Sequence, residues 1–178
     1  MDLIYAVSEF SDAGGDFRGA YWGMSKDEVK RSEGLVPLSE GEGYITYGER
    51  VMGLDSVVGY HFRDGALVEA GYAFREPLGG GRVYIREYSK VKGMLTGSYG
   101  EPALDEGEYR ECGDFCVRCS GGECSDARPL IYLSEWMTGR SVIRLVLMDG
   151  ESGYDFGLLH RSREHERTLS CREHMDMK

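Results

Sequence analysis

The strongest indication of the fold lies in residues 57–74, whose sequence is VVGYHFRDGALVEAGYAF. Aromatic and β-branched residues alternate with smaller or polar ones on both sides of Arg63-Asp64-Gly65, which is typical of two antiparallel strands joined by a tight turn. A three-residue loop with Gly65 in the left-handed conformation would align these apolar residues on one face: Val58, Tyr60, Phe62, Ala66, Val68, Ala70, Tyr72 and Phe74. We therefore predict a hairpin with one buried aromatic face. The other face would turn these side chains towards water or a partner: His61, Arg63, Glu69 and Arg75.

Two helices are predicted on either side of this hairpin. Ser25 and Glu28 have the spacing of a capping box and Gly34 supplies a C-terminal stop, so the first helix spans roughly residues 25–33. The second helix follows Gly79-Gly80-Gly81 and ends at Gly100. Its apolar residues recur at helical spacing and form one face: Tyr84, Tyr88, Val91, Leu95 and Tyr99.

Three more strands are predicted at about residues 129–136, 141–148 and 153–161, and the turn-forming residues 149–153, DGESG, join the last two. The order of helix, strands, helix and strands indicates the α+β class. We predict two similar helix-plus-antiparallel-strand units that form a two-layer sandwich, with the helices on one face of a twisted antiparallel sheet.

The chain length fits a single domain, residues 1–178. Within it, the first unit would span about residues 17–76 and the second about residues 82–162. A cysteine-rich insertion at residues 103–127 would interrupt the second unit, and the charged residues 163–178 would form a peripheral tail.

The chain is acidic, with 31 Asp and Glu residues against 21 Lys and Arg and a formal charge of −10. Such a charge opposes binding to phosphates, so we expect no nucleic acid among the partners. No apolar run approaches the ~20 residues of a membrane-spanning helix, which predicts that there is no transmembrane segment. The first residues lack the basic and long apolar regions of a signal peptide. We therefore expect a periplasmic or exported protein if a signal was removed, and a cytoplasmic one otherwise.

Residues 17–30, FRGAYWGMSKDEVK, carry a Trp-Gly-Met-Ser helix entry. This stretch resembles the W-G-M-S-x-E-E-V-K start of a group of uncharacterised bacterial proteins that are often exported or lipid-anchored. Later parts of that pattern match Tyr60-His61-Phe62, Tyr99-Gly100-Glu101-Pro102 and Trp136. The helix entry is also similar to that of small outer-membrane-assembly lipoproteins and β-lactamase-inhibitor-like domains. The resemblance implies a helix-plus-sheet binding module of the bacterial envelope, and it transfers no catalytic residue.

Four cysteines lie within thirteen residues of the insertion: Cys112, Cys116, Cys119 and Cys124. In an oxidising compartment they would form short-loop disulfides, with Cys171 left over or bridged to one of them. In a reducing compartment they could hold zinc, although the spacing is tighter than that of most zinc sites, or an iron–sulfur cluster. We favour disulfides and expect no cofactor, with zinc as the alternative.

The tail offers a second set of metal-ligating residue types: His160, His165, Cys171 and His174. Because charged residues separate them, we interpret these residues as part of a solvated, charged tail, residues 163–178, rather than as a metal site. His160 would share a strand face with Tyr154, Phe156 and Leu158, and we expect it to be a hydrogen-bonded histidine at a strand end.

No catalytic signature is present in the sequence. It contains no G-x-S-x-G nucleophile elbow, and Gly79-Gly80-Gly81-Arg82 is not followed by the Gly-Lys-Ser/Thr of a phosphate loop. We therefore predict no catalytic residue and a non-enzymatic binding or protein-interaction module with an unidentified protein partner. The alternative is a zinc or iron–sulfur protein that uses the cluster from Cys112 to Cys124.

Overall fold

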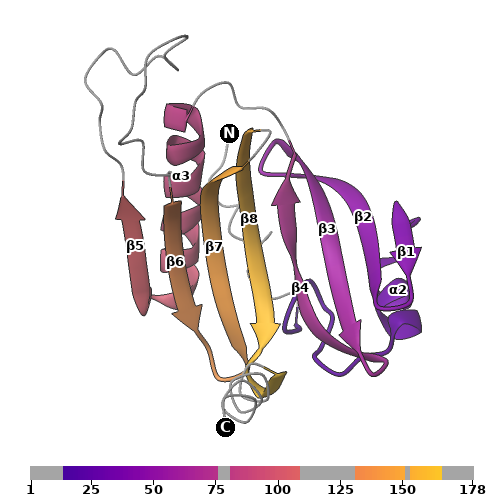
Figure 1. Ribbon diagram of the computed structural model, residues 1–178. Helices are drawn as coiled ribbons and strands as arrows, with labels where there is room; N and C mark the ends of the chain where they lie inside the picture. Colours follow the sequence, from indigo (N-terminus) through magenta and orange to yellow (C-terminus); the bar gives the residue numbers. More distant parts are fainter. Residues whose placement is uncertain (1–13, 76–80, 109–130, 151–152, 166–178) are drawn as a thin grey trace, which may run out of the picture.

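The computed structural model describes residues 14–75, 81–108, 131–150 and 153–165. Its main element is an eight-stranded antiparallel sheet with the strand order β1-β2-β3-β4-β8-β7-β6-β5 (Figure 1). The strands are β1 (Ser39–Gly41), β2 (Tyr44–Val51), β3 (Leu54–Arg63), β4 (Ala66–Phe74), β5 (Leu104–Glu108), β6 (Ile131–Met137), β7 (Ser141–Gly150) and β8 (Gly153–Ser162).

Both predicted helices are present. Helix α2 (Lys26–Glu33) begins at Ser25, whose side chain and that of Glu28 form the capping box, and it ends at Gly34 in the left-handed conformation. Helix α3 (Gly81–Tyr99) ends at Gly100, which is also left-handed and whose N–H donates to the carbonyl of Thr96. The helix boundaries were therefore predictable from local signals.

The predicted arrangement of two helix-plus-strand units in a two-layer sandwich is wrong. All eight strands belong to one continuous sheet, in which β4 and β8 pair directly although their paired residues are more than eighty positions apart in sequence. The helices have only eight and nineteen residues and lie behind parts of the sheet (Figure 1). They are too small to form a second layer over all eight strands.

The hairpin of β3 and β4 has a shorter loop than predicted. Arg63 pairs with Ala66, so the loop has two residues, Asp64 and Gly65, both with positive φ as a type I′ turn requires. A β-bulge at His61 and Phe62 then absorbs the mismatch between the two faces. At the bulge, the backbone of Leu67 exchanges hydrogen bonds with Gly23 and Met24, which gives this irregularity a structural cause.

The bulge changes the predicted face at the start of β4, where Ala66 pairs with Arg63 on the opposite face, and preserves it further along the strand. Phe62 pairs with Leu67, and Leu67 is buried where Val68 was predicted to be. Beyond the bulge, Tyr60 pairs with Ala70 and Val58 with Tyr72, so the aromatic face continues as predicted.

The two halves of the sheet meet where β4 pairs with β8. Gly71 and Gly157 allow this close approach: a Cβ atom on Gly71 would lie 2.4 Å from the carbonyl oxygen of Leu158, and one on Gly157 would lie 3.0 Å from that of Tyr72. Because backbone atoms cannot move aside as a flexible side chain can, Gly71 is required by the pairing itself.

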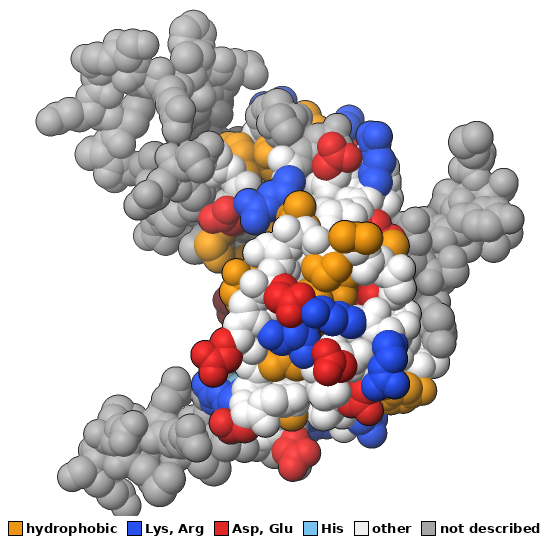
Figure 2. Space-filling view, turned by 90° about the vertical axis from the view of Figure 1, so that its right-hand side faces the viewer, with side chains coloured by type: hydrophobic (Ala, Val, Ile, Leu, Met, Phe, Trp, Pro, Cys, Tyr) orange, Lys and Arg blue, Asp and Glu red, His pale blue; other side chains and the backbone are white. Residues whose placement is uncertain are grey.

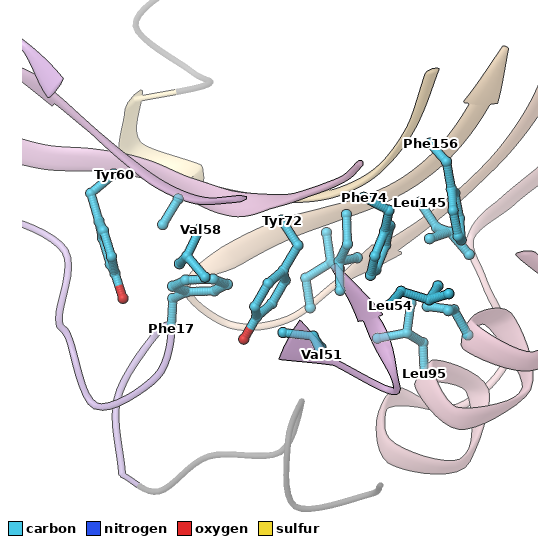
Figure 3. Close-up of a cluster of buried hydrophobic side chains, with 14 of the residues drawn as sticks. Phe17, Val51, Leu54, Val58, Tyr60, Tyr72, Phe74, Leu95, Leu145 and Phe156 are labelled. Carbon is cyan, nitrogen blue, oxygen red and sulfur yellow. The ribbon is translucent and has the colours of Figure 1, made fainter. Parts of the chain in front are cut away.

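The core lies between the helices and one face of the sheet, which we call the inner face. Phe17 packs there against Tyr60 and Tyr72, with ring centroids 5.6 and 5.1 Å apart (Figure 3). Helix α3 buries four of its five predicted face residues: Tyr84, Tyr88, Val91 and Leu95. Trp136 of β6 is buried as well, and its indole N–H donates to the carbonyl of Gly100 over 2.9 Å.

The later strands β6, β7 and β8 confirm the predicted strands to within two residues. Strand β5 lies within the segment predicted as a cysteine-rich insertion and was not predicted. In the part of the chain that the structure describes, no helix has the length and apolar character needed to cross a membrane.

Candidate functional site

The predicted cysteine site falls outside the described residues. Cys112, Cys116, Cys119 and Cys124 all lie in the stretch 109–130, and the predicted tail ligands Cys171 and His174 lie beyond residue 165. Among the residues described, no group of three or more His, Cys, Asp and Glu side chains could hold a metal ion. Disulfides and zinc at the cysteine cluster thus stay predictions.

His160 lies on the inner face of β8, as predicted from its alternation with Phe156 and Leu158. It is buried, and its ring packs against Phe17 at 5.1 Å between centroids. The predicted hydrogen bond is absent at one ring nitrogen, because Nδ1 has no partner among the described residues. Burial lowers the pKa of His160 to about 4, so it is a neutral core side chain at pH 7.

The face opposite the helices, which we call the open face, carries the most unusual surface of the sheet. One row of outward positions crosses six neighbouring strands without a polar side chain: Gly48, Val57, Ala73, Gly157, Val146 and Leu133. We call these six residues the apolar row. All six are exposed or half-buried. A solvated face of an antiparallel sheet normally carries polar side chains, so this row marks a surface suited to contact with another molecule.

Four small residues lie together at the centre of the open face. Gly59 pairs directly with Gly71, and Ala73 pairs directly with Gly157 one outward position further along the strands. We call these four residues the small-residue patch. Because their side chains end at or before Cβ, the patch is lower than its surroundings, where the larger Leu159 points outward.

Two glycines of the open face have no steric cause. A Cβ atom on Gly48 or on Gly59 would meet no heavy atom within 4 Å, and neither residue has positive φ. Glycine in a strand interior weakens the strand, and it often marks a place where another backbone or a ligand approaches closely. The fold does not require glycine at these two positions, and their effect is to leave free space above the sheet.

Charges on the open face are largely neutralised by ion pairs within it. Glu135 and Arg144 lie 2.6 Å apart on β6 and β7, and Glu69 and Arg161 lie 2.6 Å apart on β4 and β8. Each pair joins adjacent strands, in register for β6 with β7 and for β4 with β8. Both pairs lie on the same side of the apolar row, one and two outward positions away from it, and each neutralises its own charges.

A polar cluster on the inner face joins the residues before α2 to the sheet. The guanidinium of Arg18 donates from Nε and Nη2 to the two carboxylate oxygens of Glu33 at 3.1 Å each, and it lies 2.6 Å from Glu49. The hydroxyl of Tyr60 donates to the same Glu33 carboxylate. Burial raises the pKa of Tyr72, which Arg18 also contacts, to about 12. This cluster anchors α2, whose C-terminal Glu33 would otherwise oppose the helix dipole.

A second polar chain attaches α3 to β5 and β6. Ser134 donates from Oγ to Asp105 at 2.7 Å, so the Tyr88 hydroxyl, 2.7 Å from the same oxygen, is the donor to Ser134. Lys92 donates to the other oxygen of Asp105, and this hydrogen bond lowers the pKa of that carboxyl. Since each donor already has an acceptor, the chain has a structural role in holding α3 against the sheet.

A cleft of about 680 Å³ lies at the end of the sheet beside Trp22. Its cationic lining residues are already engaged: Arg140 donates to Asp16 at 2.7 and 2.8 Å, and Arg163 donates to the carbonyl of Thr138 at 3.0 Å. Glu164 also lines the cleft. This balance of charge favours no particular ligand, so the open face is the better candidate site.

Comparison of the chain with protein-family models, with curated proteins and with solved structures found no match. The resemblance to envelope proteins thus stays a prediction. Sequence reasoning placed His61 and Glu69 correctly on the open face, but it overlooked the apolar row. The available signal was the alternation of Gly48, Gly59 and Gly71 with buried strand residues.

Proposed function

We propose that this chain is a non-enzymatic protein-interaction module that binds its partner through the open face. The observation that carries the proposal is the apolar row, which crosses six adjacent strands with four apolar side chains and two glycines and has no polar side chain in contact with solvent. No described segment covers this face, which Figure 2 shows in profile at the left. Contiguous exposed apolar surface of this kind is typical of protein contact sites.

The backbone hydrogen bonding of the sheet also favours association through the open face. The six central strands have ladder partners on both sides, so their backbone hydrogen bonds are satisfied within the sheet. A partner on the open face would therefore gain mainly from burial of apolar surface, at about 25 cal/mol per Å² before the costs of association. Such a surface suits binding by shape and apolar contact better than it suits catalysis, which needs convergent polar groups.

An envelope location is part of the proposal only through the resemblance of residues 17–30 to exported and lipid-anchored proteins. The acidic charge of −10 supports a protein partner over a nucleic acid or an anionic lipid surface.

Site-specific photo-crosslinking tests the proposal. We would replace Val57, half-buried in the apolar row, with benzoylphenylalanine and irradiate the chain in its native cells. The matched control carries the same group at Ser89, an exposed position on α3. We expect a protein adduct from position 57 and none from position 89. Equal labelling at both positions, or no adduct at position 57, would refute binding through the open face.

A further inference from the structure

We infer that the partner on the open face is a second copy of this chain, so that two sheets stack face to face. This inference rests on the proposed function, because it names the occupant of the same surface. Sheets that pack in this way lie about 10 Å apart, and their side chains interdigitate. Three properties of the open face fit a copy of itself: its charge, its area and its relief.

The charge of the open face permits self-association in an acidic protein. Among the described strand residues, outward positions carry four arginines and six carboxylates, a difference of two, whereas the whole chain carries −10. These residues are Arg50, Arg63, Arg144, Arg161, Asp55, Glu69, Glu106, Glu108, Glu135 and Asp155. Two acidic chains repel each other least when they meet through the surface that has the least net charge.

The area of the face is sufficient for a specific contact. Six strands at ~4.8 Å spacing and three outward positions per strand at ~6.8 Å spacing give a flat footprint of roughly 600 Å² per copy. Side-chain relief enlarges this value, which brings it near the ~800 Å² per partner of a standard interface. A footprint limited to one or two strands would fall well short.

The relief of the face is self-complementary under a two-fold axis. The small-residue patch is a depression, and Val57 and Leu159 project beside it from β3 and β8. In an isologous contact each copy presents the same depression and the same projections, so the projections of one copy can enter the depression of the other. Gly59, which the fold does not require, keeps that depression open.

Analytical ultracentrifugation of the purified full chain over a wide range of concentration tests this inference. We expect a species of twice the 19.9 kDa chain mass at high concentration. Ala73→Arg places a charge at the exposed centre of the face, and we expect association to weaken roughly 100-fold because like charges then meet across the axis. Ser89→Arg makes the same change of charge on α3 and should leave the dimer intact. An equimolar mixture of Ala73→Arg and Ala73→Glu chains should recover it.

A native chain that stays monomeric throughout overturns the inference, as does an Ala73→Arg chain that still dimerises. Circular dichroism of each variant checks that it is folded. The outcome is separable from that of the proposed function: a position-57 adduct with a different protein and no dimer would leave an interaction module with another partner. Absence of any adduct would remove the proposed function itself.

Discussion

Replacement of Gly71 by alanine, compared with the same replacement at Gly59, measures the strain at the junction of the two halves of the sheet. The two glycines pair directly on adjacent strands and both face outward. A Cβ atom on Gly71 would lie 2.4 Å from the carbonyl oxygen of Leu158 and 3.2 Å from the Cα of Leu159, whereas a Cβ atom on Gly59 meets nothing within 4 Å. The pair therefore differs in steric contact and in little else.

The magnitude follows from two opposing contributions. In the unfolded chain, alanine has less conformational freedom than glycine, which stabilises either variant by about 0.4–1 kcal/mol. At Gly71 the new methyl group would lie 2.4 Å from the carbonyl oxygen of Leu158, so strand β8 must move away from β4 to accommodate it. Overpacking of this kind costs about 1–3 kcal/mol. Because the entropy contribution is common to both variants, the difference in their unfolding free energies isolates a clash of about 1–3 kcal/mol.

Urea denaturation followed by tryptophan fluorescence, to which the buried Trp136 and the half-buried Trp22 both contribute, provides the measurement. With a urea slope of about 1–3 kcal/mol per molar, the midpoints of the two variants should differ by roughly 1 M. All samples need the same low chain concentration, because association would add to the apparent stability. If Gly71→Ala matched Gly59→Ala, β4 and β8 would not approach as closely as described, and the continuous sheet would be in doubt.

Three further predictions concern buried polar groups. Burial lowers the pKa of His160 to about 4, against 6.5 in the unfolded chain. As the pH falls from 6.5 to 4, the unfolded chain therefore binds a proton that the folded chain does not, and the free energy of unfolding decreases by up to about 3 kcal/mol. His160→Leu should reduce that slope in urea titrations at several pH values. Ser134→Ala should cost about 1–3 kcal/mol because the Tyr88 hydroxyl loses its 2.7 Å partner and keeps only a 3.5 Å contact with the carbonyl of Leu145, and adding Tyr88→Phe should recover part of the loss in a double-mutant cycle. Arg18→Met should lower the free energy of unfolding by about 3 kcal/mol in the same assay, because it removes the cation that pairs with the Glu33 carboxylate. Arg18→Lys should restore only part of that stability, because lysine cannot donate to both carboxylate oxygens as the guanidinium does.

Local signals were sufficient to predict the helices and most of the strands. The capping box of Ser25 and Glu28 and the helical spacing of Tyr84 and Tyr88 each involve residues within one or two turns, so a single sequence contains the whole signal. Pairing of β4 with β8 depends instead on residues that are distant in sequence. No local pattern encodes such a pairing, which is why the continuous sheet was predicted as two units.

The hairpin shows how a local signal can mislead about detail. Asp64-Gly65 is a common type I′ turn sequence, and the register of the aromatic residues argued against it. Both signals were valid, and the bulge at His61 and Phe62 reconciles them. Its cause is the pairing of Leu67 with Gly23 and Met24, a contact that sequence alone did not reveal.

Some glycines of the open face are required by the fold, and others are not. Gly71 and, less tightly, Gly157 are set by the backbone of the neighbouring strand. Gly48 and Gly59 are not, and the strand would be more stable by up to ~1 kcal/mol with a β-branched residue at either position. Larger side chains at these two positions would make the fold more stable without strain, yet both positions are glycine and lie in or beside the exposed apolar row. The simplest explanation is a partner that comes close to the sheet. Stability and binding should therefore respond in opposite directions to a larger side chain at Gly59, whereas at Gly71 both should decline together.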